Sequence, residues 1–275
     1  MRLMLRPENP LAPPKVHLTQ RWLPALALAL TVVSVWATYV ARWSEGGWSD
    51  RFLAGFQFAG ALMFILMAHE GGHLFAAKRH RVEVGWPIFI PFPWWVGTLG
   101  AVIGWRGLPR SRMGLLEVAL FGPIWGAVAS VLVLLAALAM GEGTGDGLLG
   151  QPLILKLAGL LSGRAVAVGE GDPLLFASWV GFLVTGLNLL PIGQLDGGHA
   201  ARALWPKAVM PLRWATLVAI AVLGWWWPIW YLWALIAIFT GEAPQVRFSP
   251  LPPEAAALAI LGGVCWMLSF IPMPW

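Results

Sequence analysis

Charged residues are scarce in this chain. Of its 275 residues, 11% are charged and 59% are hydrophobic, and the mean hydropathy is +0.73. An ordinary soluble domain carries about 25% charged residues. The sequence therefore lacks the polar surface that water requires, and it predicts an all-α polytopic membrane protein. The length allows about six to seven transmembrane helices of roughly 20 residues each.

The chain has almost no cysteine. It also lacks the arrangement of basic residues that is typical of a nucleic-acid-binding protein. Cys265 is the single cysteine and lies in an apolar run, so it excludes an internal disulfide and says nothing of redox compartment. The net charge is +5, but Lys and Arg gather in short segments between apolar runs, where they encode membrane orientation. We therefore expect the lipid bilayer as a partner and no nucleic acid.

A regular helix is excluded from residues 82–107, although this segment is as apolar as a membrane span. Pro87, Pro91 and Pro93 interrupt it at short spacing. The stretches 82–84, 88–90 and 99–103 are typical of short strands, which predicts a small membrane-associated β-hairpin-like segment. Non-helical backbone at membrane depth must be buried in protein or line a wet cavity.

Apolar runs then divide the chain. A polar tail over 1–21 precedes a single domain over 22–275, with spans expected near 22–41, 52–77, 114–140, 174–191, 212–240 and 255–270. The first run is too long for a signal-peptide core, so we expect it to be retained. A short interfacial helix is expected over 153–168. Pro228 makes the run 212–240 either one kinked span or two short packed helices, and the sequence does not decide between them.

Lys and Arg counts set the orientation. Four of them precede the first span, and the next four segments between the spans hold 2, 6, 2 and 3. This alternation predicts a cytoplasmic N-terminus, with the second and fourth spans both ending at the cytoplasmic face. In a prokaryotic host the membrane would be the plasma membrane.

The second span ends in the sequence HEGGH, which has the HExxH spacing. His69 and His73 share one face of a helix and can reach one metal ion, while Glu70 beside them can take a proton from metal-bound water. An isolated HExxH in a soluble sequence is often accidental. Here the polar groups lie in an apolar helix, where a charge costs a few kcal/mol, so they indicate a functional site.

A catalytic zinc site usually has three protein ligands and one open position. Asp196 is the best third candidate, because it directly follows the fourth span and so lies at the same membrane face as HEGGH. Gly197 and Gly198 would let the backbone approach a neighbouring helix or the metal. Asp196 could instead cap the helix that follows it, and the sequence leaves both interpretations open.

HExxH in one span and NxxPxxxLDGG from Asn188 in a later one form a paired signature. At these residues the chain resembles the site-2 protease family, the intramembrane zinc metallopeptidases. Phe121-Gly122-Pro123 resembles an FGP-like element of the family. The stretch from Gly97 to Ile103, the stretch from Pro191 to His199 and the terminal Pro272-Met273-Pro274 resemble the branch that lacks a PDZ domain and includes plastid forms. The likeness covers roughly residues 50–275.

The resemblance implies one zinc ion per chain held by His69, His73 and Asp196, with Glu70 activating water. It also implies that Asn188 helps to hold the substrate or the developing oxyanion, although an amide in a span can simply bond a neighbouring helix. The expected function is hydrolysis of peptide bonds within or near the transmembrane segment of a single-span membrane protein, in regulated intramembrane proteolysis. A metal-ion transporter and a catalytically silent, membrane-protein-binding relative are the alternatives.

The hairpin-like segment offers a place for the substrate. A strand at 99–103 with a free edge could pair with an extended substrate, which makes Gly97, Leu99, Gly100 and Val102 candidate binding residues. We expect no catalytic role for the remaining polar residues near the site. These are Glu117, which we expect at the interface near the start of the third span, and His80, which we expect at the surface. His199 could support the metal site from beside a ligand or could be an interfacial residue without a role, and we favour the interfacial interpretation.

Overall fold

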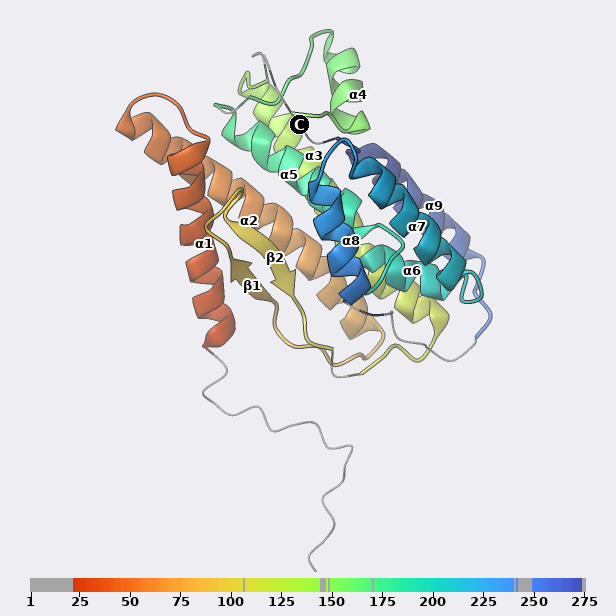
Figure 1. Cartoon of the computed structure of the whole chain (residues 1–275). Coiled ribbons are helices and arrows are strands. Elements are labelled where there is room, and N and C mark those ends of the chain that lie inside the picture. The colour runs from red at the N-terminus through yellow and green to blue at the C-terminus, as the bar shows by residue number, and fades with distance from the viewer. Residues whose placement is uncertain are drawn as a thin grey trace, which may run out of the picture.

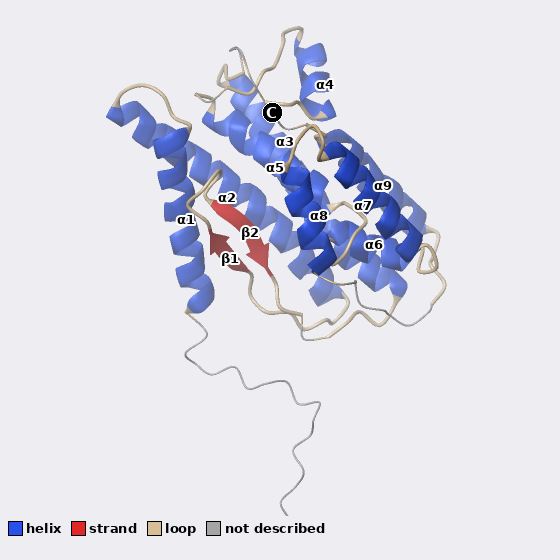
Figure 2. Cartoon of the chain, in the orientation of Figure 1, coloured by secondary structure: helices blue, strands red, loops and turns tan. Residues whose placement is uncertain are grey.

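The protein is a helical bundle with one small hairpin (Figures 1 and 2). The computed structural model describes residues 22–105, 107–143, 147, 149–169, 171–239, 241 and 249–273, so the predicted tail over 1–21 lies outside the described residues. The helices are α1 (Leu23–Arg42), α2 (Trp48–Arg79), α3 (Arg112–Ala139), α4 (Leu153–Ser162), α5 (Pro173–Asn188), α6 (Asp196–Leu204), α7 (Val209–Leu223), α8 (Ile229–Phe239) and α9 (Glu254–Ser269). The strands are β1 (Ile88–Pro91) and β2 (Thr98–Val102).

Three helices, α1, α2 and α3, are long and apolar enough to cross a membrane. The helices α4, α5, α7 and α9 are apolar but shorter, with 10–17 residues each. The prediction of a helical membrane protein is therefore confirmed, and the number of spans beyond three stays a prediction.

The run 212–240 forms two helices. The chain leaves α7 at Leu223, turns through three tryptophans and Pro228, and enters α8, which packs against α7. Proline has no backbone N–H and fits the first turn of a helix better than its interior. The structure thus decides the alternative that the sequence left open. The helix expected over 153–168 ends earlier, at Ser162, where Gly163 takes a left-handed conformation.

The hairpin expected over 82–107 is present. The strands β1 and β2 pair antiparallel, with Ile88 opposite Val102, and the expected strand at 82–84 is reduced to one bridge between Val84 and Trp105. The hairpin lies along α1 (Figure 1). Its turn is held at the far end of α1, where the Trp43 indole N–H donates to the Trp95 carbonyl at 2.7 Å.

The core is centred on α3, which packs against both α2 and α5. One polar contact inside this core joins α5 to α3: the Ser178 hydroxyl donates to the Ser130 carbonyl at 3.0 Å. Because α2 and α5 lie against the same helix, the HEGGH sequence of α2 and the segment that follows α5 come together at one end of the bundle.

Candidate metal centre

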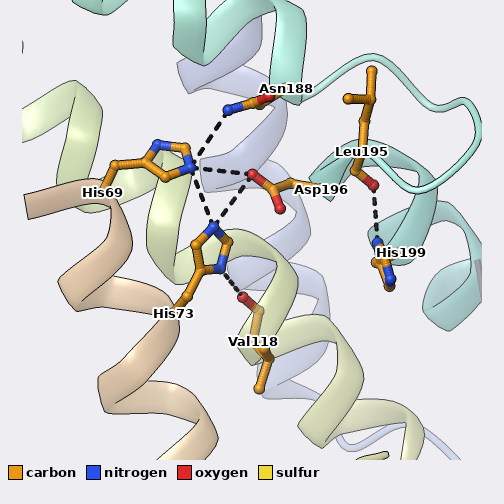
Figure 3. A network of polar contacts seen from close by, with 7 residues as sticks. All are labelled: His69, His73, Val118, Asn188, Leu195, Asp196 and His199. Carbon is orange, nitrogen blue, oxygen red and sulfur yellow. Dashed lines mark hydrogen bonds and ion pairs between the residues drawn. The ribbon is translucent and has the colours of Figure 1, made fainter. Parts of the chain in front are cut away.

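Two imidazoles and one carboxylate meet at that end of the bundle (Figure 3). His69 Nε2 lies 3.1 Å from His73 Nε2, and the Asp196 Oδ2 atom lies 3.3 Å and 3.4 Å from these two nitrogens. A tetrahedral zinc ion with bonds of about 2.0 Å keeps its ligand atoms about 3.3 Å apart. The donor set and its spacing therefore fit one zinc ion with an open fourth position.

The two histidines reach this point from one face of α2, since they are four residues apart. Asp196 is the first residue of α6, and Leu195 occupies the N-cap position. The Asp196 side chain points to the histidines instead of capping the helix (Figure 3). Of the two interpretations of Asp196, the geometry favours metal ligation.

The helix α3 fixes the orientation of the histidines. His73 Nδ1 donates to the Val118 carbonyl oxygen at 2.7 Å, which leaves the Nε2 lone pair facing the other donors. A Cβ atom on Gly122 would overlap the His73 ring, and one on Gly126 would lie 2.9 Å from His69 Nδ1. Both rings thus occupy space that only glycine leaves free on α3.

The short helix α6 is held at both ends. A Cβ atom on Gly197 or Gly198 would overlap backbone atoms of residues 189–193, so these glycines allow the close approach that the sequence predicted. At the other end, the Arg112 guanidinium donates to the carbonyl oxygens of Ala203 at 2.7 Å and Leu204 at 2.9 Å. A cation there also interacts favourably with the helix dipole.

A cavity of about 550 Å³ opens onto the three donors. Glu70 is buried in its wall beside the two histidines, and Asn188 Nδ2 lies 3.5 Å from His69 Nε2. A buried carboxylate next to an open metal position has the place required of a general base. The cavity is also lined by Ala101, Val102, Ile103, Trp105, Gln194 and His199, among others.

The predicted substrate segment divides between two environments. Val102 lines the cavity and is 57% exposed. Gly97 instead packs on α1, where its φ of +89° and the backbone of Val35 leave no room for a side chain. Leu99 is 63% exposed, and nothing lies within 4 Å of a Cβ built on Gly100.

His199, Glu117 and His80, which lie outside the group of three metal donors, are better packed than we expected from the sequence. His199, expected at the interface, is buried in the cavity wall. Its position three residues after Asp196 on α6 was the signal that could have revealed this. Glu117 is buried, accepts a hydrogen bond from His80 at 2.9 Å and forms an ion pair with Arg79 at 3.3 Å, and these contacts join the C-terminal end of α2 to α3.

Comparison with known proteins finds relatives that are named as probable zinc metalloproteases. The chain is 28% identical over 208 residues to the probable zinc metalloprotease EGY2, chloroplastic, of Arabidopsis thaliana. It is 30% identical over 203 residues to the EGY2 protein of Oryza sativa subsp. indica, and 29% identical over 233 residues to the EGY1 protein of Oryza sativa subsp. japonica. These matches cover 71%, 69% and 77% of this chain but 37%, 36% and 40% of the relatives. The chain thus spans well under half the length of the curated relatives it matches.

No solved structure matches the chain significantly. The family model for peptidase family M50 matches residues 57–224, a range that includes α2, α3, α5 and α6 with all three donor residues. Because this match covers more than half of the chain, the protein belongs to peptidase family M50.

Proposed function

We propose that this protein is an intramembrane zinc metalloprotease that hydrolyses peptide bonds within or near the transmembrane segments of other membrane proteins. The observation that carries this proposal is the triangle of His69, His73 and Asp196 donor atoms with Glu70 in the same cavity. Membership of family M50 and the zinc metalloprotease names of the relatives support it.

The three donors, Glu70 and Asn188 have different roles in the proposed reaction. A zinc ion held by the three donors would polarise the scissile carbonyl and lower the pKa of bound water toward about 7. Glu70 accepts the proton of the attacking water and later delivers it to the leaving amine. The Asn188 amide, next to His69, is placed to donate a hydrogen bond to the oxygen of the scissile carbonyl as charge develops there.

The substrate must be extended at the site, because a helix hides its carbonyl groups in its own hydrogen bonds. The strand β2 pairs with β1 on one edge, and residues 101–103 reach the cavity. An extended substrate that adds to the other edge of β2 would satisfy the backbone groups of both. In this arrangement Ala101 and Val102 are the β2 residues that reach the cavity.

The test separates metal binding from catalysis in purified, detergent-solubilised protein. The wild type should hold about one zinc ion per chain and cleave a transmembrane peptide. Asp196→Ala should lose zinc, because a catalytic site needs three protein ligands. Glu70→Gln should keep zinc and lose cleavage by roughly a hundredfold or more, because only the base is removed.

Other outcomes would point to other functions. Full zinc occupancy in Asp196→Ala would remove this residue from the ligand set. Near-wild-type turnover in Glu70→Gln would overturn the protease mechanism. Zinc binding without any cleavage by the wild type would favour a metal-binding or silent membrane-protein-binding role.

A further inference from the structure

An extended substrate bound in the cavity has two hydrogen-bonding edges. Backbone N–H and C=O groups of successive residues point alternately to the two sides of a strand. If β2 satisfies one side, the groups on the other side still need partners, since an unsatisfied backbone group at membrane depth costs several kcal/mol. The site that we propose therefore requires polar groups on the wall away from β2.

That wall is formed by α6 and the segment before it. Figure 1 shows β2 and α6 on different sides of the lower end of α2, and both contribute residues to the cavity. The polar side chains on the α6 side, besides the Asp196 carboxylate, are Asn188, Gln194 and His199. Asn188 lies against His69, and Gln194 is exposed. His199 is therefore the buried polar side chain of this wall that, among the described residues, keeps one ring nitrogen available for a substrate.

The contacts of His199 fix which of its nitrogens is free to act. Nδ1 lies 3.0 Å from the Leu195 carbonyl oxygen (Figure 3). A carbonyl can only accept, so Nδ1 carries the hydrogen. Burial lowers the pKa of His199, which keeps the ring neutral and leaves a lone pair on Nε2. The ring is held in plane by Trp105, which stacks on it at 5.5 Å and 17°.

We infer that His199 is a substrate-binding residue whose Nε2 accepts a hydrogen bond from a backbone N–H on the substrate edge that faces away from β2. The inference rests on the proposed function for the identity of the substrate. Trp105 directly follows the hairpin, so the same segment that supplies the strand also orients the acceptor for the opposite edge. The substrate would be held by its backbone on both sides, independently of its sequence.

The first measurement is binding without chemistry. In the Glu70→Gln background, the Kd of a fluorescent transmembrane peptide is compared with and without His199→Phe. Phenylalanine keeps a flat ring against Trp105 but has no acceptor. We expect Kd to rise about five- to tenfold, the value of one hydrogen bond, with zinc content unchanged. An unchanged Kd with intact zinc overturns the inference.

The second measurement identifies the bond. Peptides are made in which one amide near the scissile bond is replaced by an ester, which removes a single N–H donor. Each ester peptide should bind the Glu70→Gln protein more weakly than the all-amide peptide does. One ester should cause no further loss of affinity in the protein that also carries His199→Phe, because the acceptor for the missing N–H is already gone. Equal ester effects in both proteins at every position also overturn the inference.

These results are separable from the proposed function. If the wild type cleaves no peptide but His199→Phe still raises Kd and cancels one ester effect, the assignment of His199 stands and the proteolytic role falls. If His199→Phe loses zinc, His199→Leu is measured in the same way. Loss of zinc in both variants shows that the ring supports the metal site, and overturns the substrate-binding role.

Discussion

At the residue scale, the two glycines inside HEGGH have different surroundings. Nothing lies within 4 Å of a Cβ atom built on Gly71, whereas one on Gly72 would overlap the Phe121 carbonyl. Gly72 thus lets α2 approach α3 closely enough for His73 to reach Val118. The Gly122 and Gly126 positions of α3 serve the same contact from the other side. The metal site therefore depends on small residues that bind nothing themselves.

This difference makes a matched pair of variants. Gly72→Ala should destabilise the protein by about 1–3 kcal/mol through overpacking and should reduce zinc content. Gly71→Ala should keep zinc and be neutral or slightly stabilising, since alanine is the better helix former by up to about 1 kcal/mol. Thermal unfolding and metal analysis of both variants check this. Equal effects would mean that the α2–α3 contact does not constrain the site.

At the element scale, α3 packs against both helices that carry the proposed ligands, α2 and α6. It carries the carbonyl that orients His73, the glycines that accept both rings, and Arg112, which binds the C-terminal end of α6. The nine-residue α6 has Asp196 at its other end, so a shift of the helix moves the proposed ligand.

We predict that Arg112→Gln lowers zinc affinity about tenfold, in the range found when partners that orient a ligand are removed. The reason is that the Ala203 and Leu204 carbonyls lose their donors and α6 can shift. Competition with a chelator measures the affinity. Arg110→Gln is the control, because Arg110 is exposed and two residues away. Unchanged affinity in Arg112→Gln would show that α6 is held without this contact.

The hairpin gives a second prediction at this scale. Val102→Pro removes a backbone donor from β2 and should cut proteolysis strongly while zinc content survives. Val102→Ala should do much less, because the proposed contact is made by the backbone. Cleavage rate and zinc content are measured for both variants. Mild and equal effects would leave the hairpin as a packing element against α1 rather than a substrate-binding strand.

At the scale of the whole molecule, the remaining question is which membrane face carries the metal centre. The loop after α2 and the end of α6 lie at one end of the bundle, and α4 lies at the other (Figure 1). From the Lys and Arg alternation we predict that the first end is cytoplasmic, and the proposed active site would then lie near that face.

Cysteine labelling in intact bacteria tests this orientation. In a Cys265→Ser background, cysteines at Lys78 and Trp205 should resist an impermeant reagent until lysis, and one at Ser162 should react at once. All three positions are exposed, so accessibility within the protein does not limit the reaction. Labelling of the first two positions from outside would reverse the orientation.

The sequence by itself determined the class of protein, and it predicts the chemistry of the site. Scarce charge and long apolar runs leave no fold except a membrane protein, because water cannot solvate such a surface. HExxH requires only a local helix to bring His69 and His73 to one face, so this pairing could be predicted without the tertiary structure. Closely spaced prolines forbid a helix in any context, which is why the hairpin could be predicted.

Only the tertiary structure decided matters that depend on contacts between distant segments. Whether Asp196 caps a helix or joins the histidines depends on where α6 lies relative to α2. The two helices are more than a hundred residues apart in the sequence. The burial of His199, the clamp by Arg112 and the contact of Gly97 with α1 likewise arise from packing. Local sequence determines which side chains lie on one face of a helix or strand. The packing of the helices determines which residues those side chains contact.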